Sequence, residues 1–188
     1  LTDPDKLGNF TSENLSPKAL RVTTISDELK INGNGLGLVY SIAPDAQQAI
    51  VMAGHAGNGA FWINDVNGKW STTTFYTDVP QAISTRNYKT PLAVRLDTMM
   101  WSPAMDLAKY PDIPVHKKYY PFRYVFPSSR KDRYSSYKKS ALVNEEVTSV
   151  ALDFLKSLNM GGRGETDMLN IAYTAAPFND ECGHGSVE

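Results

Sequence analysis

Apolar residues recur at helical spacing near the end of the chain. They stand at i, i+3, i+4, i+7 and i+11, the positions of one helix face: Val147, Val150, Ala151, Phe154 and Leu158. Gly161-Gly162 then ends the pattern, as glycines often do at helix C-termini. The following segment, 167–173, is typical of a strand, so the two elements form one half of a βα repeat. The apolar stripe predicts that the helix packs on another layer.

An earlier stretch predicts a second helix and a buried strand. Ser16-Pro17 is typical of an N-cap followed by proline at the first helical position, and apolar residues follow at helical spacing. We therefore expect a helix over residues 17–31. The apolar run 36–42 is short and bounded by glycine and proline, which is typical of a strand buried on both faces. A helix followed by a buried strand indicates an α/β fold.

The pattern changes between residues 49 and 76. The apolar segment 49–52 predicts a short strand, and 54–59 is a turn-rich break. Two further strands, 61–63 and 70–76, flank a loop that contains an Asn-Gly step, a strong hairpin signal. We expect this hairpin to be a small, exposed element.

Residues 103–140 show no sustained period of either kind and are rich in proline, tyrosine and basic residues. Such a segment is typical of an irregular excursion over the surface. Basic and aromatic residues alternate at 130–134 and 137–139, as in some nucleic-acid-binding segments. The net charge of the 188-residue chain is only −1, so we interpret this run as a solvated loop face and expect no nucleic-acid partner.

The composition excludes several kinds of metal site, cross-link and targeting segment. The chain is ordinary globular material, with 41% hydrophobic and 21% charged residues. Its single cysteine, Cys182, excludes an internal disulfide and any two-cysteine metal motif. No apolar stretch is long enough to span a membrane, and the first residues do not form a signal peptide. The chain starts at Leu1 without an initiator methionine, which favours a processed or trimmed polypeptide.

One pair of residues carries candidate metal chemistry. Asp180 and His184 follow a few residues after the predicted strand 167–173, where open α/β sheets gather their ligand-binding groups. A carboxylate and an imidazole at this spacing can converge on one divalent metal, and both are normal zinc ligands. Two ligands alone do not make a site, and an Asp-x-x-x-His sequence also occurs by chance in surface loops.

The order of several motifs resembles a known family. These motifs are Ser16-Pro17 with 22–29, Ala53-Gly54-His55-Ala56 with 60–62, 68–76, and Asp180-x-x-Gly183-His184. The set is similar to bacterial alkaline phosphatases of the type I phosphodiesterase and nucleotide pyrophosphatase group, in the alkaline phosphatase superfamily. The resemblance spans most of the chain and is weakest over 103–140. It implies a partial alkaline-phosphatase-like α/β/α sandwich with a peripheral hairpin and a long irregular insertion.

The resemblance also implies a chemistry. Members of the family attack phosphorus with a Thr or Ser nucleophile activated by one zinc ion, while a second zinc stabilises the leaving oxygen. Asp180 and His184 would be two ligands of that second zinc. The nucleophile and the remaining ligands would lie outside residues 1–188, so we expect the chain to be the central portion of one catalytic domain, with 49–140 as insertions, and inactive alone. The implied partner is a phosphate-ester substrate and the implied location is periplasmic or otherwise exported; oligomeric state stays open.

The sequence departs from the resembled pattern at two positions. Phosphomonoesterase members carry Lys-x-Arg shortly before the Gly-His element, where the cations bind phosphate oxygens. Asp45 and Gln47 occupy these positions. Because a dianionic monoester gains most from added positive charge, their presence favours a diester or another substrate.

Other residues have plainer interpretations. His55, in a glycine-rich turn, could bind a metal but is interpreted as structural or exposed, and His116 as exposed. Cys182 is interpreted as a bystander. The hairpin aromatics could form a sugar or nucleobase platform but are more often packing residues: Trp62, Trp70, Phe75 and Tyr76. Two rival functions remain, a non-catalytic degenerate relative and an aromatic-rich glycan-binding module.

Overall fold

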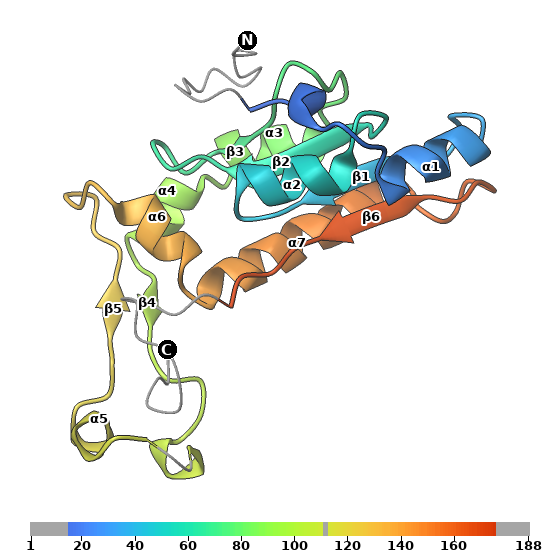
Figure 1. Cartoon of the computed structure of the whole chain (residues 1–188). Helices are drawn as coiled ribbons and strands as arrows, with labels where there is room; N and C mark the ends of the chain where they lie inside the picture. Colours follow the sequence, from blue (N-terminus) through green and yellow to red (C-terminus); the bar gives the residue numbers. More distant parts are fainter. Residues whose placement is uncertain (1–14, 111–112, 176–188) are drawn as a thin grey trace.

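The centre of the molecule is a four-stranded sheet (Figure 1). The computed structural model describes residues 15–110 and 113–175. The sheet order is β3-β2-β1-β6, in which β1 pairs parallel with both β2 and β6 and β3 is antiparallel to β2. The strands are β1 (Val39–Ile42), β2 (Gly59–Ile63), β3 (Trp70–Ser71) and β6 (Met168–Ile171). The predicted strands within 36–42 and 167–173 are therefore confirmed.

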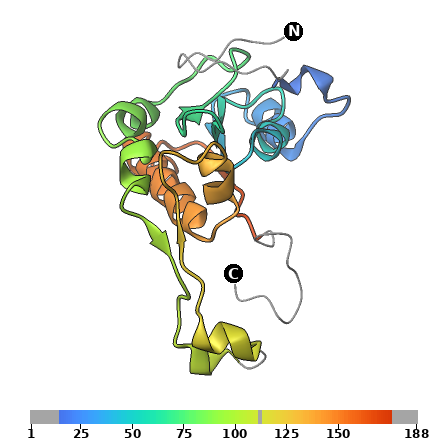
Figure 2. The same cartoon turned by 90° about the vertical axis from the view of Figure 1, so that its left-hand side faces the viewer.

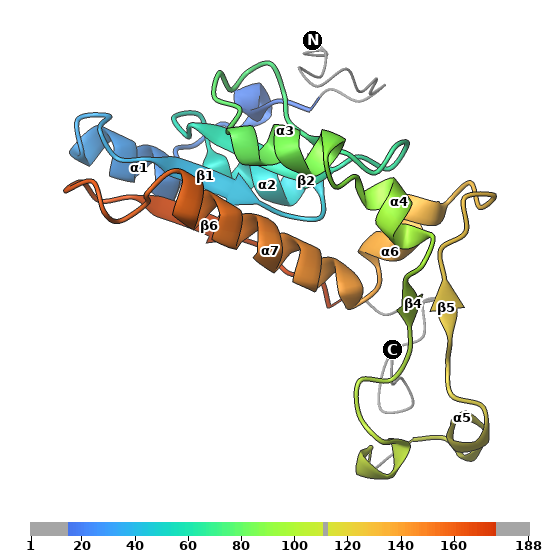
Figure 3. The ribbon, with the colours of Figure 1, turned by 180° about the vertical axis from the view of Figure 1, so that it is seen from behind.

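Helices cover both faces of this sheet (Figures 1 and 3). Side chains alternate between the faces of each strand; in β2, Phe61 packs toward one core cluster and Ala60 and Trp62 toward the other. One layer contains α1 (Ile25–Asn32) and α2 (Ala46–Ala53), and the other contains α3 (Gln81–Tyr88) and α7 (Leu142–Ser157). The predicted α/β/α sandwich is confirmed.

Helix α7 confirms the strongest periodic pattern in the sequence. Its stripe is buried against the sheet, and Phe154 has no exposed surface. The Phe154 ring meets Tyr40 of β1 and Phe61 of β2 edge-on, with centroids 5.4 and 5.5 Å apart. Each such buried side chain stabilises the fold by about 1.5–3 kcal/mol through apolar burial.

The predicted helix over 17–31 is wrong in its extent. Ser16 is an N-cap, but of a short 3-10 helix, η1 (Pro17–Ala19), after which the chain is extended. The α-helix begins only at Ile25, where Thr24 and Asp27 form a reciprocal capping box. These two side chains satisfy the free N–H groups at the helix start, and so they fix where it begins.

The predicted strand 49–52 is also wrong, because these residues belong to α2. Ala49, Ile50 and Ala53 are buried against β1 and β2, at helical spacing, while Val51 is about half exposed. The turn-rich break that follows α2 is confirmed.

The hairpin is confirmed as the pair β2 and β3, in which Trp62 lies opposite Ser71 and Ile63 opposite Trp70. The predicted strand 70–76 is wrong in its extent, because β3 ends at Ser71. Its predicted exposure is wrong, because all residues of both strands are buried and β2 lies inside the main sheet. Residues 64–69 form the turn, in which the Asn64 N–H donates to the Lys69 carbonyl and the Gly68 N–H donates to the Asn64 carbonyl.

A narrow arm leaves this sandwich (Figures 1 and 2). After α4 (Leu92–Leu96), strands β4 (Met100–Trp101) and β5 (Tyr124–Val125) pair antiparallel, and the segment between them carries η2 (Leu107–Lys109) and α5 (Val115–Tyr119). The prediction of an irregular excursion is confirmed here.

The end of the predicted excursion differs from expectation. Residues 133–138 form α6 (Arg133–Lys138), which returns to pack on α7. Arg133, Tyr137 and Lys138 are 5%, 0% and 9% exposed, so the interpretation of this run as a solvated loop face is wrong for them. Arg133 instead donates hydrogen bonds to backbone oxygens of Phe126 and Ala93 and pairs with Asp97.

Candidate functional site

The carboxyl ends of the parallel strands mark the candidate site, because open α/β sheets bind ligands there. Asp45 follows β1 and is the N-cap residue of α2, and Gln47 lies on the first turn of that helix. Asp65 follows β2. Two acidic side chains, each more than half exposed, therefore stand beyond the ends of adjacent strands.

A lysine from α6 joins these two carboxylates. Lys138 Nζ lies 2.6 Å from Asp45 Oδ1 and 2.7 Å from Asp65 Oδ1, while its own side chain is only 10% exposed. Burial works to lower the pKa of Lys138, but the hydrogen bonds to the two aspartates outweigh it and hold this pKa above its ordinary value. The ammonium is thus charged and covered, and the carboxylates are the groups that face solvent.

The loop that carries Asp65 is held by hydrogen bonds and close packing. Asn64 Oδ1 accepts hydrogen bonds from the backbone N–H groups of Val66 and Asn67, at 2.8 and 3.3 Å. Gly68 closes the turn at φ +69° and packs against the ring of Tyr134 of α6. A side chain at position 68 would collide with that ring, so glycine lets α6 approach the end of the sheet.

The predicted metal ligands Asp180 and His184 lie outside the described residues, as does Cys182. Strand β6, which precedes them in the sequence, ends beside β1 at the same end of the sheet as Asp45. Within residues 15–110 and 113–175, no group of three or more His, Cys, Asp or Glu side chains is placed to hold a metal ion. The zinc ligands therefore stay a prediction.

His55 contacts a buried carboxylate. It follows α2 on the amino side of β2, where its Nδ1 lies 3.5 Å from Asp27 Oδ2. Burial works to raise the pKa of Asp27, but hydrogen bonds from the Ala56 and Thr24 N–H groups, the Thr24 hydroxyl and His55 hold it below its ordinary value. The interpretation of His55 as structural or exposed is in line with this contact and with its 38% exposed side chain, and His116 is exposed as expected.

The hairpin aromatics are packing residues. Trp62, Trp70 and Tyr76 are 5%, 1% and 2% exposed. Trp70 Nε1 donates to Glu146 at 3.1 Å, and the Tyr76 hydroxyl donates to the Gly54 carbonyl at 2.6 Å. Faces buried in this way cannot stack on a sugar, so the glycan-platform alternative is wrong for these three rings.

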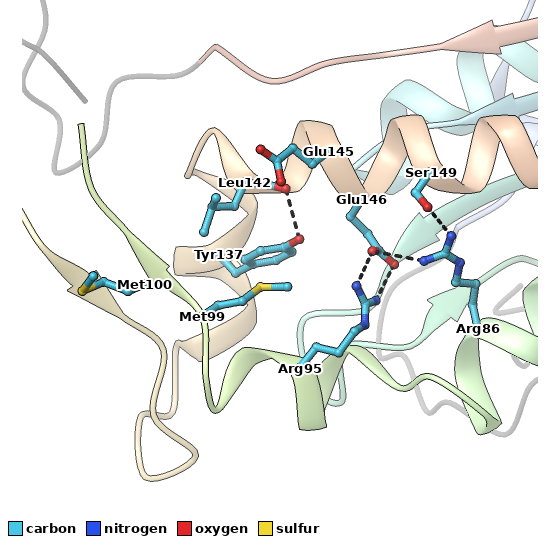
Figure 4. Close-up of a pocket in the computed structure, with 9 residues that line it drawn as sticks. All are labelled: Arg86, Arg95, Met99, Met100, Tyr137, Leu142, Glu145, Glu146 and Ser149. Atoms are coloured by element: carbon cyan, nitrogen blue, oxygen red, sulfur yellow. Dashed lines mark hydrogen bonds and ion pairs between the residues drawn. The ribbon is translucent and has the colours of Figure 1, made fainter. Parts of the chain in front are cut away.

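A pocket of about 430 Å³ lies at the base of the arm (Figure 4). Its polar wall centres on Glu146, which accepts two 2.8 Å hydrogen bonds from Arg95 and has Arg86 NH1 3.6 Å away. Arg86 also binds Ser149 and Asp153. The lining residues are Arg86, Arg95, Met99, Met100, Tyr137, Leu142, Glu145, Glu146 and Ser149. Both arginines of this pocket are paired with acidic side chains. The polar wall of the pocket is therefore a network of ion pairs that joins α3, α4 and α7.

Comparisons with known proteins agree with the observed fold. No protein-family model matches the chain. Over 197 aligned positions, which cover 97% of the chain, it is 26% identical to alkaline phosphatase PhoV of Synechococcus elongatus. It is 31% identical to alkaline phosphatase PafA of Elizabethkingia meningoseptica over half of the chain. The crystal structure of wild-type PafA matches 86% of the chain with a TM-score of 0.66 and 24% identity. In sequence and in fold, the chain is similar to members of the alkaline phosphatase superfamily.

The match to this superfamily is partial in length. A PafA mutant structure aligns with a TM-score of 0.67 and 26% identity, and the chain covers 34% of that structure. It covers 35% of PhoV and 17% of PafA in the sequence comparisons. A shorter match, 42% over 67 residues, is to a protein named calcium-transporting ATPase of Myroides odoratus, of which the chain covers 12%. The chain thus spans about a third of the length of PhoV and of the PafA crystal structure, which it matches over most of its own length.

Among the helices of the described residues, none is both long and apolar enough to cross a bilayer.

Sequence reasoning missed Lys138. Its local sequence, Tyr137-Lys138-Lys139, is typical of an exposed basic turn. The burial of Lys138 follows only from the packing of α6 at the end of the sheet, which brings it to Asp45 and Asp65.

Proposed function

We propose that the polypeptide containing this chain is a phosphoric ester hydrolase that uses zinc. The observation that carries the proposal is the match to PhoV over 97% of the chain, together with the PafA-like fold. Both relatives are named alkaline phosphatases. The proposed active site lies at the carboxyl ends of β1, β2 and β6.

Asp180 and His184 would hold one zinc ion, since a carboxylate and an imidazole form a donor set that suits this metal. When bound, zinc would supply positive charge beside the oxygens of the phosphoryl group. The Thr or Ser nucleophile and the other ligands would come from outside residues 1–188. The chain alone is therefore expected to be inactive. The superfamily resemblance also supports export, for example to a periplasm.

For the substrate, we propose a phosphate diester or another ester of lower negative charge than a monoester dianion. Asp45 presents a carboxylate that is 53% exposed, and Lys138 is covered behind it. An approaching phosphate dianion meets carboxylates first and is repelled by them. This charge arrangement and the absence of the Lys-x-Arg cations at Asp45 and Gln47 therefore favour the same class of substrate.

The test uses the complete gene product, with its bound zinc measured, on matched aryl monoesters and diesters. We expect hydrolysis of the diester in preference, loss of at least about a hundredfold in kcat/KM on Asp180→Ala or His184→Ala, and reduced zinc content. The matched control is His116→Ala, an exposed histidine of the arm, which should keep both activity and zinc.

Three results would contradict the proposal. Turnover by the purified 188-residue chain that survives Asp180→Ala would refute the placement of the nucleophile. Full activity of the His184→Ala enzyme would refute the ligand assignment. A strong preference for monoesters would refute the substrate class while leaving the hydrolase proposal intact.

A further inference from the structure

The tip of the arm exposes apolar and aromatic side chains. It consists of η2 and of residues 113–120, which include α5, and it lies away from the sandwich in every view (Figures 1, 2 and 3). Ile113 is only 6% exposed, so the tip has an inner face. Val115, Tyr119 and Tyr120 are 68%, 76% and 83% exposed. Val115 and Tyr119, at i and i+4, share the outward face of α5.

The arm is positively charged, unlike the rest of the chain. Residues 100–125 contain four Lys or Arg and two Asp residues, a net charge of +2 in a chain of net charge −1. The remaining residues therefore carry −3. Lys109, Lys118 and Arg123 are exposed. Side chains of this kind lay their apolar stems along apolar surface and keep their charged ends in water.

The shape of the tip favours a surface over a small molecule or a folded protein. Small molecules bind in concave pockets, whereas α5 turns its apolar face outward from a narrow projection (Figure 2). One side of a typical protein–protein interface takes about 20–30 residues, which is more than the tip contains. A lipid bilayer requires neither a pocket nor a large footprint, because amphipathic rings settle at the level of its headgroups.

We propose that the tip of the arm docks on the surface of a bilayer that contains anionic phospholipids. Val115, Tyr119 and Tyr120 enter the headgroup region, where the tyrosine hydroxyls meet water and the rings meet acyl chains. Lys109 and Lys118 lie against the anionic headgroups, which attract cations over about a Debye length. The same surface repels the negative remainder of the chain, so the molecule approaches with the arm first.

A second copy of the chain fits the tip less well than a bilayer does. Two tips related by a two-fold axis would bring the lysines of both copies together, and like charges repel. The tip could meet the negative remainder of another copy only head to tail, an arrangement that produces rings or filaments instead of a dimer. The inference goes beyond the proposed function and does not depend on it, because docking is measured without any substrate.

Flotation of the complete gene product with lipid vesicles tests the proposal. We expect the protein to bind vesicles of phosphatidylcholine mixed with phosphatidylglycerol, and not vesicles of phosphatidylcholine alone. Binding should weaken as salt is raised from about 0.05 to about 0.5 M. Replacing Tyr119 and Tyr120 together by serine should lower the partition coefficient about tenfold or more. Each lysine near an anionic leaflet contributes about fivefold, so Lys109→Gln with Lys118→Gln should lower it about 25-fold.

Exposed residues of the sandwich supply matched controls. Tyr88→Ser, and Lys89→Gln with Lys156→Gln, should bind vesicles like the wild type, because these side chains are exposed far from the tip. A second measurement reports insertion directly. The added fluorescence of Tyr119→Trp should be quenched by lipids with brominated acyl chains, and that of Tyr88→Trp should not. Unchanged circular dichroism of each variant shows that it is folded.

Three outcomes would overturn the proposal. The first is the absence of binding to anionic vesicles; self-association that the Tyr119 and Tyr120 replacements abolish would then make a second copy the occupant. The second is vesicle binding that the tyrosine and lysine variants of the tip leave unchanged, which would assign docking to another surface. The third is binding lost only in the lysine variant, with Tyr119→Trp unquenched, which would reduce the contact to adsorption on any polyanion.

Discussion

Replacing Lys138 by methionine tests the bridge at the end of the sheet. Methionine keeps a flexible stem of similar length but removes the ammonium, so the contacts of 2.6 and 2.7 Å to Asp45 and Asp65 are lost. A hydrogen bond to a charged group contributes about 1.5–3 kcal/mol. Both aspartates are more than half exposed, so water replaces part of each lost hydrogen bond. With half of the summed energy of the two hydrogen bonds lost, the free energy of unfolding should fall by about 1.5–3 kcal/mol.

The assay is urea unfolding of the 188-residue chain, followed by circular dichroism. In thermal unfolding, the same loss in the free energy of unfolding would lower the Tm of a chain of this size by about 3–12 °C. Lys139→Met is the matched control, because Lys139 is the exposed neighbour of Lys138 and its change should stay within about 0.5 kcal/mol. A double-mutant cycle of Lys138→Met with Asp45→Asn should give a coupling energy of about 1 kcal/mol.

The pH dependence supplies an independent check. Because the pKa of Lys138 is raised in the folded state, its stabilisation is fully present below the ordinary value of 10.5 and is lost as pH rises through the folded pKa. The difference between wild type and Lys138→Met should therefore be constant near neutral pH and shrink above about pH 10.5. Equal midpoints for the Lys138 and Lys139 variants, with zero coupling to Asp45, would refute the bridge.

Two further substitutions test the packing around the site. Gly68→Ala should lower the free energy of unfolding in urea by about 2–3 kcal/mol, because a Cβ there would lie 2.2 Å from the Tyr134 ring. The control Gly161→Ala has a similar positive φ but lies in open space, so it should lower that free energy by only about 1 kcal/mol. Equal losses would argue against the contact between Gly68 and the Tyr134 ring. Asp27→Asn should make the free energy of unfolding less dependent on pH below about pH 4. Hydrogen bonds lower the Asp27 pKa despite burial, so the ionised carboxylate stabilises the fold until pH falls through that pKa. Parallel stability curves from pH 2 to 6 would contradict this role.

The elements that the sequence predicts well are those defined by a local period. Helix α7 and strand β1 follow directly from apolar spacing, because each buries a face that its own residues define. The segment Ala49 to Met52 is ambiguous, since a short apolar run fits a buried strand or a helix face equally well. Only the packing of Ala49, Ile50 and Ala53 against the sheet decides between the two.

The candidate site depends on contacts that no local pattern contains. Asp45 stands out in the sequence only against the resembled Lys-x-Arg, and nothing near it points to Lys138. The two meet because Tyr134 packs on Gly68 and places α6 at the end of the sheet. The prolines of 103–140 predict irregular chain correctly, but they conceal the short helix that returns from the arm.

The arm has a consequence for how such a domain diversifies. The chain leaves the sandwich at Trp101 and returns at Tyr124, and these residues lie opposite each other in the β4–β5 pair. Their rings, 5.7 Å apart, close the base together with Phe122. Insertions or deletions between these points leave the positions of the departing and returning strands unchanged. Evolution can therefore alter the length and chemistry of this segment without disturbing the register of the sheet that carries Asp45 and Asp65 at its end.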